Sequence, residues 1–131
     1  MPVRKVEHVG IMVKHMETSI EFYRSVLGLE LLGTMDHPNG MVKLAFLGFP
    51  GAKETLVELI EGYPGAVTEE GRVHHIAFAV DNIEEEIARI SKLNVTFIDP
   101  DITVLPDGSK YRFFIGPDGE RLELFQPAKL V

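Results

Sequence analysis

The hydrophobic pattern of the chain occurs twice. Residues 7–13 and 74–80 each read as a polar residue, a histidine, then apolar, small and apolar positions that end on valine, and the two segments lie 67 residues apart. Alternation of this kind predicts a strand with one buried face. A segment with apolar residues at helical spacing follows each strand, and the same offset carries Ile20 onto Ile87. The repetition through strand and helix predicts a duplicated unit.

Local signals place the ends of the two helices. Thr18 with Glu21 has the form of a capping box and predicts the start of the first helix, and Asp81 with Glu84 predicts the start of the second. Gly28 stands where a glycine commonly ends a helix. Each half is therefore expected to continue from its first strand into one capped helix.

Further strand-like stretches follow each helix. They cover 29–35, 41–47 and 55–61 in the first half, and 95–98, 110–115 and 121–126 in the second. Asn39-Gly40 and Pro117-Asp118-Gly119 are turn signals, and 61–72 reads as a linker. Each half thus has the order strand–helix–strand–strand–strand, which is an α+β fold. We expect one domain, residues 1–131, built from tandem βαβββ modules at 1–62 and 73–131.

Composition restricts the classes of function. The chain has 131 residues, of which 45% are hydrophobic and 25% charged, as is usual for a globular protein. Its formal net charge of −7 opposes nucleic-acid binding. The absence of cysteine excludes disulfides, thiolate metal sites and cysteine nucleophiles. No signal-peptide core and no membrane-length apolar run is present, so we expect a cytoplasmic protein without a membrane partner.

Each half places a histidine in its first strand and a glutamate in its last. His8 precedes Glu58 by 50 residues, and His75 precedes Glu123 by 48. Strand alternation puts these side chains on the face opposite the branched apolar ones. An imidazole and a carboxylate in apolar surroundings are costly unless they are paired or bound to metal. The four residues therefore predict a site for one divalent metal ion, such as Zn, Ni, Co or Mn, whose identity stays open.

Other histidines and aromatic residues have simpler interpretations. His74 is expected to point away from the metal site, because adjacent strand residues alternate between faces. His15 and His37 are expected to face solvent from loops. Three aromatic residues are expected in the core or in a pocket wall: Phe46, Phe113 and Phe125.

Several short segments together are typical of one known superfamily. They are the strand with His8, Phe22-Tyr23 with Leu27-Gly28-Leu29, the strand with Glu58, His75-Ile76-Ala77, Gly116-Pro117-Asp118-Gly119 and Leu122-Glu123-Leu124. Over nearly its whole length the chain resembles the vicinal-oxygen-chelate superfamily, which includes glyoxalase I, methylmalonyl-CoA epimerase, extradiol dioxygenases and bleomycin-binding proteins. The resemblance implies two βαβββ modules that form a cup-shaped mixed sheet around the metal, in a homodimer. In some short members the cup is completed across the dimer.

The resemblance also implies a reaction. It points to a metal-dependent glyoxalase I-like lyase or isomerase (lactoylglutathione lyase type), in which a ligand carboxylate moves a proton α to a carbonyl through a metal-stabilised enediolate. Glu123 and Glu58 are the candidate bases. Glutathione-dependent glyoxalases carry Arg where Met12 stands and Asn where Gly62 stands, and both residues hold glutathione carboxylates. The small-molecule substrate is therefore unassigned, and a different thiol, a smaller substrate or no thiol is indicated.

Two other functions stay open. A methylmalonyl-CoA epimerase-like isomerase fits residues 7–11 and 74–78, but the stretch 35–43 lacks the second glutamate base of such enzymes. A non-catalytic small-molecule binding protein of the bleomycin-resistance type is the second alternative, although such relatives lack the four ligands. Three-ligand thiol transferases and ring-cleaving dioxygenases fit less well, because Glu58 supplies a fourth ligand.

Overall fold

The computed structural model describes residues 7–52, 54–62 and 73–128. The chain divides into two compact units, Met1–Val67 and Thr68–Val131. Most of the predicted linker, residues 63–72, lies outside the described residues. The two units are described one at a time, because each has its own sheet and its own helix.

The first unit contains one helix and a four-stranded sheet. Its elements are β1 (Val9–Val13), α1 (Met16–Ser25), β2 (Glu30–Asp36), β3 (Lys43–Gly48) and β4 (Val57–Glu61). The strand order is β1-β4-β3-β2. β1 pairs with β4 in parallel, and the other pairs are antiparallel. The first and last strands of this half are therefore neighbours in the sheet, with α1 and the β2–β3 hairpin between them in sequence.

The second unit repeats this topology. Its elements are β5 (Ile76–Ala79), α2 (Ile83–Ile90), a 3-10 turn η1 (Ser91–Leu93), β6 (Thr96–Phe97), β7 (Thr103–Val104), β8 (Lys110–Ile115) and β9 (Arg121–Gln126). The strand order is β5-β9-β8-β6, and β7 also pairs with β8. β5 and β9 are parallel, as β1 and β4 are. The predicted α+β arrangement of strand, helix and strands is confirmed in both halves.

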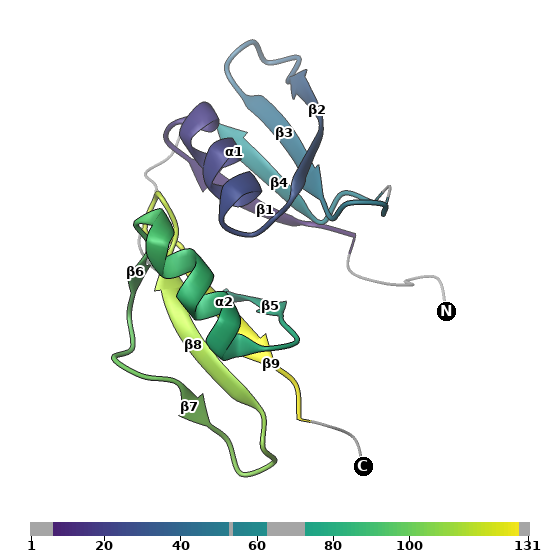
Figure 1. Ribbon diagram of the computed structural model, residues 1–131. Helices are drawn as coiled ribbons and strands as arrows, with labels where there is room; N and C mark the ends of the chain where they lie inside the picture. Colours follow the sequence, from purple (N-terminus) through teal and green to yellow (C-terminus); the bar gives the residue numbers. More distant parts are fainter. Residues whose placement is uncertain (1–6, 53, 63–72, 129–131) are drawn as a thin grey trace. The chain divides into compact units, whose positions relative to one another are not determined.

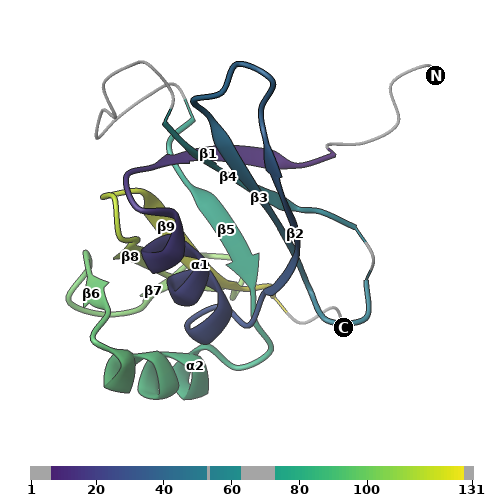
Figure 2. The same ribbon diagram turned by 90° about the horizontal axis from the view of Figure 1, so that it is seen from above.

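One face of each sheet is apolar and lies under its helix. Figure 1 shows α1 lying across the first sheet and α2 lying across the second, and Figure 2 shows the same arrangement from above. Alternate residues of β1 and β4 are buried, as the pattern indicated. The buried apolar side chains are Ile11, Val13, Tyr23, Val26, Leu29, Val42, Ala45, Leu47, Val57 and Leu59 in the first unit, and Phe78, Ile83, Ile90, Phe114, Leu122 and Leu124 in the second. Removal of these side chains from water stabilises each unit.

The predicted turns are confirmed, and one strand was missed. Gly40 and Gly119 have φ values of +73° and +84°, which favour glycine, and each donates its N–H to a carbonyl three residues earlier. The pair Thr103–Val104 forms β7 between the predicted strands 95–98 and 110–115, where no strand was predicted. Two residues are too few to show a period, so only the pairing with Tyr111 and Lys110 defines this strand.

The first helix begins before the predicted capping box. It starts at Met16, so Thr18 and Glu21 lie inside it, and the prediction of Thr18 as N-cap is wrong. The Ser19 N–H donates to the His15 carbonyl oxygen at 3.1 Å, which extends the helical ladder to an earlier residue. His15 makes no side-chain cap hydrogen bond. Backbone bonding alone therefore sets this helix start.

The second helix is capped by the neighbour of the predicted residue. Asn82, in an extended conformation, accepts a hydrogen bond from the Glu85 N–H at 3.1 Å, so Asp81 is not the N-cap. Asp and Asn both favour the N-cap position, and the sequence pattern pointed to the wrong one of these two neighbours. Three glutamates then occupy the first turn, where the helix dipole favours negative charge.

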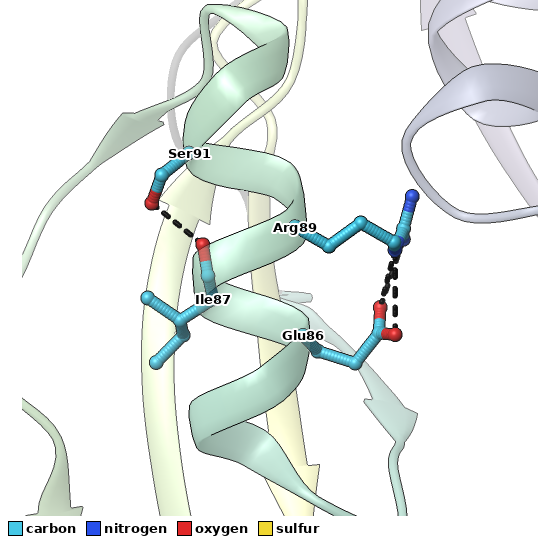
Figure 3. A network of polar contacts seen from close by, with 4 residues as sticks. All are labelled: Glu86, Ile87, Arg89 and Ser91. Atoms are coloured by element: carbon cyan, nitrogen blue, oxygen red, sulfur yellow. Dashed lines mark hydrogen bonds and ion pairs between the residues drawn. The ribbon is translucent and has the colours of Figure 1, made fainter.

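Specific contacts close the C-terminal ends of both helices. Gly28, with φ of +73°, donates its N–H to the Arg24 carbonyl oxygen at 3.1 Å, which confirms its predicted place at the end of α1. In α2, the Ser91 hydroxyl donates to the Ile87 carbonyl oxygen at 2.6 Å (Figure 3). Arg89 pairs with Glu86 one turn earlier at 2.8 Å, as the dashed lines in Figure 3 show. Neither described helix is long and apolar enough to cross a membrane.

The two candidate caps of α2 give a direct test. Asn82→Ala should lower the free energy of unfolding by about 1 kcal/mol, because the Glu85 N–H loses its acceptor. Asp81→Ala should change it by less than about 0.5 kcal/mol. Urea denaturation of both variants beside the wild type measures the difference. A larger loss in Asp81→Ala than in Asn82→Ala would contradict the cap seen here.

Candidate metal centre

The first unit brings His8 and Glu58 together at the start of its parallel strand pair. Glu58 lies opposite Gly10 in the β1–β4 register, and His8 lies two residues before Gly10 on the same side. The His8 Nε2 atom is 3.3 Å from the Glu58 Oε2 atom. Residues 50 positions apart in sequence therefore meet because the first and last strands run in parallel.

The second unit brings His75 and Glu123 together in the same way. Glu123 lies opposite Ala77 in the β5–β9 register, and His75 lies two residues before Ala77. The His75 Nε2 atom is 3.3 Å from the Glu123 Oε2 atom. The sequence repeat is thus also a repeat of the contact between imidazole and carboxylate.

An aromatic residue flanks the glutamate of each pair. Phe46 of β3 lies opposite Glu58, and Phe113 of β8 lies opposite Glu123. The Phe113 ring centroid is 5.0 Å from that of His75, with the rings edge to face. Both rings are half-buried. They fit the wall of a site better than the core, where Phe114 is fully buried.

The two carboxylates have different surroundings. The Glu58 side chain is 18% exposed and the Glu123 side chain 8%. Burial raises the pKa of the Glu123 carboxyl, because its charged form is poorly solvated there. His75 acts on this pKa in the opposite direction, Asp99 adds to the rise, and His74 lowers it more weakly. In the metal-free protein, burial therefore makes the Glu123 carboxyl hold its proton to a higher pH than an ordinary glutamate does.

The sequence pattern predicted that His74 points away from the metal site, and this prediction is wrong. Its Nδ1 atom is 2.8 Å from the Nδ1 atom of His75, and the two rings meet edge to face. Arg121 contacts the other ring nitrogen of His74. β5 begins only at Ile76, and His74 lies two residues before it, so the alternation between strand faces does not fix the direction of its side chain. His15 and His37 are exposed, as expected.

The donor types suit a divalent transition metal. Imidazole nitrogen and carboxylate oxygen are the ligands that Zn, Ni, Co and Mn accept in proteins. In the part of the chain that the structure describes, no group of three or more His, Asp or Glu side chains is close enough to hold a metal ion. Each unit thus supplies one pair of donors, and the four-ligand site of His8, Glu58, His75 and Glu123 stays a prediction.

A side chain at Gly62 would meet the backbone. Gly62 follows β4 with φ of +85°, and a Cβ atom there would lie 2.3 Å from the Met41 carbonyl oxygen. An asparagine at this position, as in glutathione-dependent glyoxalases, would therefore require the backbone to move. Met12, at the other departing position, is a half-buried residue of β1.

An open cavity of about 720 Å³ lies in the first unit on the side of the helix. It is bounded by the start of α1 and by the ends of β2, β3 and β4, with Asp36, Lys43 and Glu61 among its lining residues. Glu61 lies three residues after Glu58 on β4, so the two side chains leave opposite faces of the sheet. The cavity therefore lies on the other face from the His8–Glu58 pair. No pattern in the sequence marks this cavity, because its lining residues come from separate elements.

Known proteins with similar sequences belong to one superfamily. The family model described as the Glyoxalase/Bleomycin resistance protein/Dioxygenase superfamily matches residues 5–124. The uncharacterized protein YwbC of Bacillus subtilis is 47% identical over 123 residues, which are 94% of this chain and 98% of that protein. A lactoylglutathione lyase of Salmonella typhimurium is 33% identical over 122 residues, which are 91% of this chain and 90% of that enzyme.

A solved structure supports the fold directly. The trypanothione-dependent glyoxalase I of Leishmania major matches with a TM-score of 0.78 and 30% sequence identity, covering 95% of this chain and 87% of that one. A match that spans both halves confirms the α+β fold class inferred from the sequence.

Burial of Glu123 predicts how pH affects the stability of the metal-free protein. Its pKa is raised in the folded state, so its contribution to stability is present below the unfolded pKa and is lost as pH rises through the folded pKa. Glu123→Gln is neutral at every pH, so in chelator it should have a higher Tm than the wild type at neutral pH. The difference should vanish toward about pH 4, where the wild-type carboxyl is protonated.

Thermal denaturation followed by circular dichroism measures both proteins across this pH range. Glu30→Gln, at an exposed position of β2, is the matched control. Its Tm should stay close to that of the wild type at every pH. A lower Tm of Glu123→Gln at neutral pH would show that the His75 contact outweighs the burial.

Proposed function

The chain belongs to the Glyoxalase/Bleomycin resistance protein/Dioxygenase superfamily, as its sequence indicated, and from this premise we propose that it is a metal-dependent lyase or isomerase of glyoxalase type. The observation that carries the proposal is the duplicated pair, in which a histidine nitrogen and a glutamate oxygen are 3.3 Å apart in each unit. Two such pairs supply the four ligands expected from the sequence. A cytoplasmic homodimer is part of the same proposal.

The four residues would divide the work between binding and proton transfer. His8, Glu58, His75 and Glu123 would hold one divalent ion. When bound, the ion would polarise vicinal oxygens of the substrate and offset developing negative charge. The protein itself would move the proton, and a carboxylate at the metal is the available base.

Glu123 is the stronger candidate for the base that removes the proton α to a carbonyl. Its carboxylate is the more buried of the two, so water competes less for the substrate proton there. The His75 Nε2 atom lies 3.3 Å from this carboxylate, so the two groups could reach the same ion. Glu58 has the equivalent contact to His8 and would be the second group for proton transfer. It would accept a proton from the substrate or return one to it.

The substrate would not be a glutathione adduct held in the usual way. Met12 offers no charge for a substrate carboxylate, and Gly62 offers no side chain and no space for one. A hemithioacetal formed from another or a smaller thiol would not need these contacts. Phe46 and Phe113 would provide apolar walls beside the two glutamates.

Metal analysis of the purified full-length chain tests the site first. After dialysis without chelator, the wild type should hold about one divalent ion per chain, since its four donors complete one site. His75→Ala should hold little, because one of the two imidazoles is lost. His15→Ala removes an exposed histidine that makes no cap contact and should retain the wild-type metal content. Equal metal in wild type and His75→Ala would contradict the proposal.

Substitution of the buried glutamate tests the proton-transfer role. With hemithioacetals of several thiols as substrates, Glu123→Gln should lower kcat by about 100-fold or more, because the amide cannot accept the proton. Glu30→Gln should keep the wild-type kcat. Full activity in a folded, metal-loaded Glu123→Gln variant would exclude Glu123 as the base. Activity on an acyl-CoA ester alone would instead favour the epimerase-like reaction.

A further inference from the structure

The loop between β2 and β3, residues 37–42, holds one exposed asparagine through both its backbone and its side chain. The Asn39 side-chain oxygen accepts hydrogen bonds from the N–H groups of Met41 at 2.9 Å and Val42 at 3.0 Å. The Asn39 N–H donates to the His37 Nδ1 atom at 3.1 Å. The next N–H, that of Gly40, donates to the His37 carbonyl oxygen at 3.0 Å. These hydrogen bonds fix the asparagine together with the glycine that follows it.

An asparagine followed by glycine is prone to deamidation, because glycine has no side chain to hinder the reaction. The Gly40 backbone nitrogen loses its proton and attacks the side-chain carbonyl carbon of Asn39. A bond forms between that nitrogen and that carbon, the bond from the carbon to Nδ2 breaks, and ammonia leaves with the proton. Water then opens the five-membered imide at either carbonyl, which gives aspartate or isoaspartate. The chain supplies both reacting groups, and only water is added.

The other two asparagines of the chain are poor sites for this reaction. Asn82 precedes Ile83, and Asn94 precedes Val95. Both following side chains are branched at Cβ and crowd the backbone nitrogen that would attack. Asn82 also uses its side chain to cap α2. The sequence therefore favours rapid deamidation at Asn39 above the other two.

The folded loop opposes the reaction at both reacting atoms. The Gly40 nitrogen must lose its proton, and in the loop this N–H is donated to a carbonyl oxygen. The Asn39 carboxamide must turn toward that nitrogen, and its oxygen is held by two N–H groups further along the chain. The same two donors would stabilise negative charge on the oxygen during attack. That stabilisation has no effect while the Gly40 nitrogen keeps its proton, so protection is the larger effect.

We propose that Asn39 is a deamidation site controlled by the β2–β3 loop, which reacts when the loop opens and is protected while the loop hydrogen bonds are formed. The rate in the folded protein is then the rate in an open chain multiplied by the fraction of time that the loop is open. Exposed loops open at a lower free-energy cost than the core of a protein does. The modification therefore accumulates with the age of the folded protein.

Isoaspartate at position 39 would prevent the loop from closing again. The backbone would run through the former side-chain carbons and would gain a methylene group between Asn39 and Gly40. The hydrogen bonds to the Met41 and Val42 N–H groups depend on the original spacing. The Met41 carbonyl also lies against Gly62, where a Cβ atom would be only 2.3 Å from its oxygen. The modified loop would therefore lose its close packing against the end of β4.

Comparison of the folded and unfolded full-length chain measures the protection. Wild-type protein is incubated in mildly alkaline buffer, with and without concentrated guanidinium chloride, and peptide mass spectrometry follows each asparagine. Asn39 should deamidate at least about tenfold more slowly in the folded chain, because several hydrogen bonds must break first. Asn82 and Asn94 are internal controls and should change much less than Asn39 in the unfolded chain. An equal rate for Asn39 in the two states, or a faster rate in the folded chain, overturns the proposal.

A variant that loosens the loop without unfolding the chain gives the second test. His37→Ala removes the acceptor of the Asn39 N–H and should speed deamidation of the folded chain about fivefold, the effect of one lost hydrogen bond. Hydrogen exchange of the Met41 and Val42 N–H groups should rise by a similar factor. His15→Ala, at an exposed position before α1, should keep the wild-type rates.

The unfolded chain separates loop opening from a chemical role of the imidazole. In guanidinium chloride, His37→Ala and wild type should deamidate at the same rate, because no loop remains to be opened. A slower or unchanged rate in folded His37→Ala would overturn the proposal. A slower rate would mean that the imidazole assists the attack, and an unchanged rate would mean that the loop hydrogen bonds do not limit it.

Discussion

Parallel pairing between the first and last strands of each unit is the constraint on which the site depends. A parallel pair cannot be joined by a tight turn and needs a crossover, which the helix and the intervening strands supply here. The register then sets Glu58 opposite Gly10 and Glu123 opposite Ala77. The histidine two residues earlier reaches the carboxylate in both halves. Any change in register by one residue would send the glutamate to the helix-covered face.

Burial under the helices decides which face of each sheet is free for chemistry. α1 and α2 cover the branched apolar faces, and the polar pairs occupy the others. Duplication gives the two pairs the same geometry but not the same environment. Glu123 is more buried than Glu58. The residue before His75 is a second histidine, whereas the residue before His8 is a glutamate. A duplicated scaffold thus carries two His–Glu pairs in different surroundings.

Membership in the superfamily accounts for the scaffold more fully than for the substrate. The likeness to a glyoxalase I covers nearly the whole chain, and the repeated donor pairs lie on the strands that the topology brings together. Under the proposed function, substrate contacts would depend on positions such as Met12 and Gly62, whose residue types the fold does not fix. At Gly62 the positive φ and the nearby Met41 carbonyl leave no room for a side chain without a shift of the backbone.

The sequence by itself determined the duplication, the α+β class, the main strands and turns, and the two pairs of His8 with Glu58 and His75 with Glu123. These features follow from periodicity and from glycine at turns, which are local properties repeated at a fixed offset. Only the tertiary structure decided the rest. Asn82 caps α2 in place of Asp81. β7 is defined by its pairing with β8. His74 lies before β5 and contacts His75, so strand alternation does not set its direction. Each of these depends on backbone or side-chain contacts whose geometry no local pattern records.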